Sequence, residues 1–483
     1  MAVINPQEVA PLQSLRDLSG GTVTEVIDAL LPDNTFRLIQ NMDSDVIGAL
    51  RVRKGTTAIG DQLVDGKSVK GLYNFRDSGT GANSQQIAGI DNSGGTQAVL
   101  KYNNAGTWTD ISGGTSYTAG AKFRFATFLD LAFIVNSAFD AVKSWSGSGA
   151  LGTSQLTSVP VGQFINVFKS RLYIAGTSAN PDRVYFSSIP DISGNITWTT
   201  ATDWLDVNPS DGMNITGLAN TGTLLLIFKE RALYRWNGRA TDADLVVDIG
   251  TTSQESVASR NGATYFFNPY GIWITDGGYP IRISKPIQRW IDAISSSYHA
   301  SVAGVCDDDH YYCSVGDVTV DGVAYANVVL TYTISTKTWS VRTYPEQITS
   351  FANYIGSSGQ YGVMAGNDDG DVLDYNVGST DAGSPISYRT KSKKLDFGAF
   401  AFVKEFSDVF MYADKLPGAQ LFITVEDGAP RAQKSGLLAW FWRFLGQKYR
   451  GRYFVFEVVG TSIDGQGELW GLEITNLSVS GYR

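Results

Sequence analysis

The chain has 483 residues, which is too long for one ordinary domain unless the fold is a repeat or a propeller. Its 52 glycines, 12% aromatic residues and only 18% charged residues favour short strands joined by tight turns over helical bundles or coiled coils. The net charge of −9 argues against a broad nucleic-acid-binding surface, because proteins that grip phosphates are usually basic. Two cysteines exclude a disulfide scaffold and indicate assembly in a reducing compartment.

Residues 1–60 are predicted to form an N-terminal arm that ends in the first strand. Its first 21 residues lack the basic start and apolar block of a signal peptide, and no apolar run in the chain is long enough to span a membrane as a helix. Residues 33–34 resemble a helix cap, which predicts a short helix holding Phe36 and Ile39.

Residues 61–377 are predicted to form a degenerate β-propeller of about six to eight blades. A unit of several short strands recurs every 40–50 residues, the length of a four-stranded blade, and apolar and polar residues alternate within the strands. The units cover residues 69–111, 120–150, 162–198, 212–238, 248–284, 301–345 and 348–376.

One segment departs from this strand pattern. Ile287, Trp290, Ile291 and Ile294 follow Pro286 at the spacing of one helix face. We expect a short helix that crosses between two blades and serves packing.

Residues 385–483 are predicted to form a C-terminal β-sandwich-like domain, because their length and strand pattern suit one small sandwich. The Gly/Ser-rich residues 378–385 are interpreted as the linker before it. Residues 437–445, which include Trp440, Phe441 and Trp442, are the most apolar stretch and favour a buried interface.

No residue pattern predicts catalysis, and we expect a protein that is not an enzyme and has no cofactor. Asp369 and Asp371 lie in half of a calcium-loop pattern, but the distal Glu is missing and Asp-Gly is also a hairpin-turn signal. Cys306 and Cys313 flank an acidic turn, and a zinc site would require a further Cys pair that the chain lacks. These four residues are therefore weak metal candidates, with plain turns and strands favoured.

Basic residues gather locally in three places. Arg51, Arg53 and Lys54 form one group, a second occupies residues 389–394, and Arg452 belongs to a third. Each group could contact a phosphate or an acidic partner, although charged residues at alternating strand positions usually form the solvated face of the strand.

A series of phrases in a fixed order now resembles a known family. The phrases occupy residues 33–34, 41, 48–55, 271–284, 332–341, 369–372, 380–381, 386–390, 395–398, 451–454 and 470–473. In this order they resemble the tail nozzle, or tail hub and DNA-stabilisation, propeller proteins of short-tailed double-stranded DNA phages. Lys54 replaces the proline of the family phrase, and the chain is shorter than many nozzles.

The resemblance implies a structural virion protein located in the tail and assembled in the host cytoplasm. It implies a ring of six copies beneath the portal and adaptor, which extends and closes the DNA channel and conducts DNA at ejection. The implied partners are further copies of the chain, portal and adaptor proteins, tail fibres or spikes, and passing DNA read without sequence recognition. The resemblance and the residue patterns together mark Arg51, Arg53, Lys54, residues 440–442 and Arg452 as interface candidates.

Two other classes of function stay open. A carbohydrate-binding or carbohydrate-cleaving propeller at a cell surface could use surface tryptophans such as Trp108, Trp198 and Trp204 to stack on sugars. An intracellular scaffold that binds peptides would also fit a propeller.

The acidic composition suits a DNA conduit, because like charge keeps phosphate from adhering to the wall.

Overall fold

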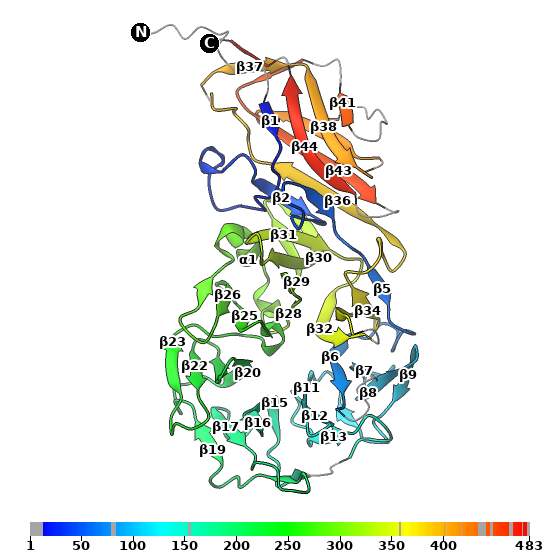
Figure 1. Ribbon diagram of the computed structural model, residues 1–483, viewed down its shortest axis with the longest axis vertical. Coiled ribbons are helices and arrows are strands. Elements are labelled where there is room, and N and C mark those ends of the chain that lie inside the picture. Colours follow the sequence, from blue (N-terminus) through cyan, green and yellow to red (C-terminus); the bar gives the residue numbers. More distant parts are fainter. Residues whose placement is uncertain are drawn as a thin grey trace.

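The computed structural model is nearly all β, with a ring of small sheets joined at one side to a β-sandwich (Figure 1). It describes residues 13–78, 84–152, 156–356, 359–399, 401–416, 418–432, 441–444, 448–462, 467–475 and 477–480. Within these residues no helix is long and apolar enough to cross a membrane.

Seven blades form the ring in the part of the chain that the structure describes. From the inner to the outer strand, blade 1 consists of β6 (Val69–Arg76), β7 (Ser84–Asp91), β8 (Gln97–Asn104) and β9 (Thr107–Asp110), and blade 2 of β11 (Phe123–Phe128), β12 (Leu131–Asn136) and β13 (Lys143–Trp145). Blade 3 consists of β15 (Gly162–Phe168), β16 (Arg171–Thr177), β17 (Arg183–Phe186) and β19 (Trp204–Asp206). Blade 4 consists of β20 (Ile215–Thr221), β21 (Leu224–Lys229), β22 (Leu233–Trp236) and β23 (Asp244–Val247). Blade 5 consists of β24 (Ala258–Arg260), β25 (Ala263–Asn268), β26 (Gly271–Thr275) and β27 (Ile281–Arg282). Blade 6 consists of β28 (Ala303–Cys306), β29 (His310–Val320), β30 (Val323–Thr333) and β31 (Thr338–Thr343). Blade 7 consists of β32 (Ile348–Ile355), β33 (Tyr361–Asn367), β34 (Val372–Tyr375) and β5 (Thr56–Ala58).

The first strands of successive blades lie next to each other all the way round, and β32 of blade 7 contacts β6 of blade 1. Separate apolar cores fill the spaces between blades, because apolar residues on the strands of one blade pack against those of the next. The arm supplies the outer strand of the last blade, since β5 pairs with β34. This pairing joins the beginning and end of the ring and covers an edge that would otherwise be exposed. The predicted propeller is confirmed.

Short strands and turns lie between or beside these longer strands. The small strands are β10 (Tyr117–Thr118), β14 (Leu156–Thr157), β18 (Ile196–Thr197) and β35 (Thr380–Asp381), and the 3-10 turns are η2 (Asp28–Leu30), η3 (Gln254–Ser256), η4 (Lys285–Ile287) and η5 (Ser296–Tyr298). The predicted crossing helix is confirmed as η4 followed by α1 (Gln288–Asp292), between blades 5 and 6. Its four apolar residues are all buried, as their spacing predicts.

The sandwich is built from both ends of the chain. One of its sheets contains β2 (Phe36–Gln40), β36 (Ser384–Ser392), β43 (Phe454–Ser462), β39 (Gln420–Val425) and β40 (Arg431–Ala432). The other contains β1 (Gln13–Leu15), β3 (Met42–Asp43), β4 (Leu50–Val52), β44 (Glu468–Thr475), β38 (Asp408–Asp414) and β41 (Phe441–Phe444). A small third sheet joins β42 (Tyr449–Gly451), β37 (Val403–Phe406) and β45 (Ser478–Ser480). Arm residues such as Met42, Leu50 and Val52 lie in one core with C-terminal residues such as Met411 and Phe456.

One strand of the arm connects the two parts of the molecule. β2 lies parallel to β31, the outer strand of blade 6, and antiparallel to β36 of the sandwich. A single sheet therefore runs from the propeller into the sandwich (Figure 1).

Two local predictions are wrong. Residues 36–40 form strand β2 in place of the expected helix, because two neighbouring sheet edges pair with this segment and tertiary pairing outweighs local propensity. Residues 378–385 are more than a linker, since they contain β35 and the start of β36, and Asp381 is buried.

Candidate functional site

The most heavily bonded charged side chain at the junction of propeller and sandwich is Arg53, directly after β4. Its side chain has no exposure to solvent, and Asp381 of β35 is 6% exposed. The guanidinium donates to both carboxylate oxygens of Asp381, at 2.8 and 2.5 Å. It also donates to the backbone oxygens of Lys54 and Thr343, and lies 4.2 Å from the ring centroid of Tyr344. Such bidentate geometry fixes the orientation of both groups.

A second buried ion pair crosses the same junction. Arg342 of β31 donates from Nη2 to Oδ2 of Asp43 in β3, at 2.7 Å. Ser340 of β31 donates to the other oxygen of Asp43. Burial opposes the charge of Arg342, but the Asp43 carboxylate favours it, and the pKa of Arg342 stays well above its usual value. This pair links blade 6 to the sandwich.

Asn41 lies between the two ion pairs and bonds to both parts of the molecule. Its side-chain oxygen accepts hydrogen bonds from Arg53 Nε and the Thr343 backbone N–H, each at 2.9 Å. Its amide donates to Thr343 of blade 6 and to the backbone oxygen of Ser387 in β36. We call the set Asn41, Asp43, Arg53, Arg342 and Asp381 the joint.

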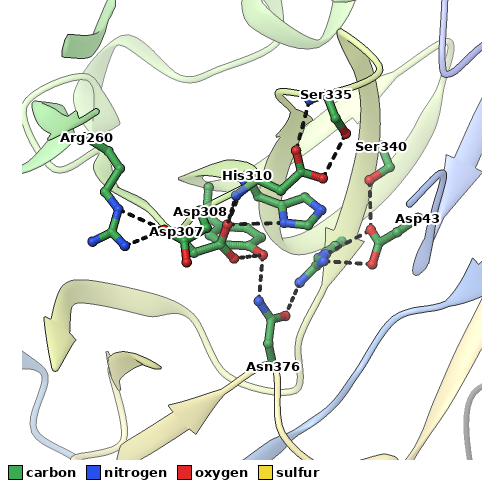
Figure 2. Close-up of polar contacts among 11 residues, drawn as sticks. Asp43, Arg260, Asp307, Asp308, His310, Ser335, Ser340 and Asn376 are labelled. Atoms are coloured by element: carbon green, nitrogen blue, oxygen red, sulfur yellow. Dashed lines mark hydrogen bonds and ion pairs between the residues drawn. The ribbon is translucent and has the colours of Figure 1, made fainter. Parts of the chain in front are cut away.

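A further polar network extends from the joint into blades 6 and 7 (Figure 2). Asn376 accepts a hydrogen bond from Arg342 and donates to the hydroxyl of Tyr312. That hydroxyl donates to Asp307 at 2.7 Å, and His310 contacts the same carboxylate through Nδ1. The Asp307 carboxylate and the His310 imidazole thus belong to one continuous hydrogen-bond network.

The environment shifts the pKa values of this carboxylate and imidazole in opposite directions. Burial raises the pKa of Asp307, but the hydrogen bonds from His310 and Tyr312 outweigh it and the pKa falls to about 2. Burial lowers the pKa of His310, but Asp307 outweighs that effect and the pKa lies above its usual value. Both shifts favour an ionised Asp307 beside a protonated His310.

Ion pairs also cross the middle of the propeller. Glu255 of η3, just before blade 5, accepts hydrogen bonds from Lys122 and from Arg124 of β11 in blade 2. Burial raises the pKa of Glu255, but these two cations outweigh it and the pKa falls to about 2. Arg124 also donates to the backbone oxygen of Gln163 in blade 3. The axis of the propeller is therefore bridged by side chains.

The weak metal candidates lie in ordinary structural settings. Cys306 and Cys313 are buried free thiols on neighbouring strands, and Cys313 is paired in register with Gly304, so the thiols are offset along the ladder. Asp369 accepts from Gln62 and the backbone N–H of Gly66, and Asp371 accepts from Asn367. Among the described residues, no group of three or more His, Cys, Asp or Glu side chains is arranged to hold a metal ion.

The predicted interface residues occupy different settings. Arg51 pairs with Glu468 inside the sandwich, and Arg53 is enclosed in the joint, which assigns it to contacts within one subunit. Arg452 is half-exposed and pairs with Glu426, while Lys54 is exposed. Trp440 lies outside the described residues. Phe441 and Trp442 belong to β41, which pairs with β38.

Two residues of the joint, Asp43 and Arg342, were not singled out by the sequence. They lie 299 residues apart in the chain, and each is a common residue type at an unremarkable position. The phrases at residue 41, residues 48–55 and residues 380–381 include the other three, Asn41, Arg53 and Asp381, but no sequence pattern showed that they meet. A buried lysine was also missed, since Lys393 is 6% exposed although its basic cluster predicts a solvated face.

Comparisons with known proteins add little beyond the fold. No protein-family model matches the chain, and no curated protein matches it. Solved structures similar to it include the AfRom2 CNH domain, with 8% identity, 66% of this chain and 98% of that chain covered, and a TM-score of 0.38. The Pan2 WD40 domain of Neurospora crassa is 7% identical, with 67% of this chain and 94% of that chain covered and a TM-score of 0.42. The extracellular domain of a one-component system from B. thetaiotaomicron is 11% identical, with 87% of this chain and 63% of that chain covered and a TM-score of 0.42.

Proposed function

We propose that this chain is a structural subunit of a phage tail. Six copies form a ring beneath the portal and adaptor, which extends and closes the DNA channel and conducts DNA at ejection. The proposal begins from the ordered series of sequence phrases and from their agreement with an arm, a propeller and a terminal sandwich. The observation that carries it is the joint.

A closed ring requires each subunit to present two contact surfaces at a constant angle. Domains connected by a flexible linker do not meet this requirement, because their relative orientation varies. Here β2 continues one sheet across both parts, and two buried ion pairs hold the same junction. The chain thus has the rigidity expected of a building block.

Because side chains bridge the propeller axis, we propose that the DNA path does not run through the propeller itself. Lys122, Arg124 and Glu255 occupy the middle of the propeller, so the conduit of the proposed assembly is the central hole of the ring of subunits. A net charge of −9 per chain suits a wall along which DNA slides without adhering. Exposed apolar residues are available for subunit contacts, including Ile27, Ile47 and Ile192.

Mass photometry of the purified chain, alone and with a portal–adaptor preparation, tests this proposal. We expect a species of about six subunit masses, appearing or increasing with the adaptor, and ring-shaped particles in negative-stain images. A stable monomer in both conditions would overturn the ring. Lys54→Ala and Arg452→Ala test the two exposed interface candidates, and we expect them to weaken assembly without changing the melting temperature.

The carbohydrate alternative loses the residues on which it rested. Trp108 and Trp198 are buried, and the ring of Trp204 lies 3.7 Å from the guanidinium of Arg183. If a glycan array and a hydrolase screen were both blank, this alternative would be excluded.

A further inference from the structure

A cleft lies beside the turns that follow the first strands of blades 5 and 6, and described residues of the first two strands of blade 7 line its other side. Its volume is about 350 Å³. Arg260 and Asp308 line it from blades 5 and 6, and Asn353, Gln360 and Tyr361 line it from blade 7. Clefts lined by an aromatic ring and a few polar groups are the usual setting for small-ligand binding.

The rear wall of the cleft is already organised. Asp307 accepts hydrogen bonds from the backbone N–H groups of Asp309 and His310, at 2.8 and 2.6 Å, in addition to those from its side-chain partners. Asn376 is held from both ends by Tyr312 and Arg342 (Figure 2). A ligand therefore meets a surface that needs no ordering upon binding, which reduces the entropic cost of association.

The front of the cleft offers groups that remain accessible. Tyr361 is 65% exposed, and the guanidinium of Arg260 lies 5.0 Å from its ring centroid. Arg260 also binds Asp308, whose side chain is 74% exposed (Figure 2). The side chains of Asn353 and Gln360 are exposed beside this ring. Donors and acceptors thus surround an aromatic face that is supported by a cation.

We propose that this cleft binds an uncharged saccharide unit. The apolar face of a sugar ring can pack on Tyr361, while its hydroxyls donate to Asp308 and accept from Arg260 and the amides of Asn353 and Gln360. Its binding is independent of ring assembly.

The charges favour this ligand over ionic ones. A cation that stacked on Tyr361 would meet Arg260, which already lies against that ring. An anion would meet the carboxylates of Asp307 and Asp308. A neutral polyhydroxylated ligand avoids both repulsions and can use both kinds of group.

Saturation-transfer difference NMR on the full chain tests the proposal, with chitotriose and maltotriose as neutral probes. We expect signals from at least one of them. Tyr361→Ala should weaken binding at least fivefold, and Asn353→Ala about threefold. Tyr279→Ala is the matched control, since Tyr279 is 71% exposed and lies outside the cleft, and should bind as the unmodified chain does.

Three results would overturn the assignment. One is the absence of signals from both neutral probes. Another is equal binding by Tyr361→Ala and Tyr279→Ala, which would place the sugar elsewhere. The third is stronger binding of 6′-sialyllactose or trilysine than of the neutral probes, which would identify an ionic site.

Discussion

Replacing Arg53 with Met tests whether the joint holds the two parts of the molecule together. Methionine keeps much of the side-chain length but removes the charge, so Asp381 becomes a buried, unpaired carboxylate. Removing one partner of a buried ion pair costs about 3–5 kcal/mol. The orphaned backbone oxygen of Thr343 adds about 1 kcal/mol. We expect a loss of about 4–6 kcal/mol in the free energy of unfolding, a large part of the stability of a typical domain.

Urea denaturation followed by tryptophan fluorescence measures this loss, because the chain has 11 tryptophans. A double-mutant cycle with Asp381→Asn isolates the pair, and we expect the double variant to lose less than the sum of the two single variants, by about 1–3 kcal/mol. Arg51→Met is the matched control. Arg51 is 29% exposed, so its ion pair should contribute less than about 1 kcal/mol.

A small effect would refute this reasoning. If Arg53→Met and Arg51→Met lowered the free energy of unfolding equally, burial of the Arg53 pair would not be decisive. Additive costs in the cycle would show that Arg53 and Asp381 act independently, and the joint would then be held chiefly by β2.

Three further predictions concern other parts of the chain. Asp307→Asn should lower the free energy of unfolding by about 2 kcal/mol at pH 5. The difference from the unmodified chain should shrink as the pH falls from about 3.8 to about 2, because Asp307, whose pKa is lowered, stabilises the fold only while its carboxylate is ionised. Glu255→Gln should lower the melting temperature, since Lys122 and Arg124 lose their shared counter-ion. Gly55→Ala should destabilise the joint, because a Cβ there would lie 1.9 Å from the backbone oxygen of Thr380.

Each of these has a measurement and a contrary result. Urea titrations at several pH values test Asp307→Asn, and the prediction fails if the variant and the unmodified chain differ in free energy of unfolding by the same amount at pH 5 and pH 2. Differential scanning calorimetry at low and high salt tests the second, and an unchanged melting temperature would show that the bridging pairs are dispensable. Limited proteolysis tests the third with Gly356→Ala as control, where a Cβ meets nothing closer than 3.6 Å; equal cleavage of both variants would contradict it.

The parts of the fold that repeat locally were predictable. Alternating apolar residues reveal strands, and their recurrence every 40–50 residues reveals blades, because each blade buries its faces against its neighbours in the same way. The crossing helix was equally predictable, since Ile287, Trp290, Ile291 and Ile294 are buried by one face whatever lies opposite.

Predictions that depended on distant partners were less reliable. Phe36 and Ile39 suit a helix face locally, yet residues 36–40 form a strand because β31 and β36 offer two edges for pairing. Arg53 and Lys393 resemble solvated strand positions, but Asp381 and blade 6 enclose Arg53, and the arm covers Lys393. No local pattern records which surface another segment will cover.

The sequence by itself determined an all-β chain, the blade period, the crossing helix and the acidic charge, since each depends on residue types and short spacings. Only the tertiary structure decided that the arm closes the last blade, that both chain ends share one sandwich, and that Asp43, Arg53, Arg342 and Asp381 meet. The physical reason is that a charged side chain is buried only where a partner satisfies it, and these partners are brought together by folding across hundreds of residues.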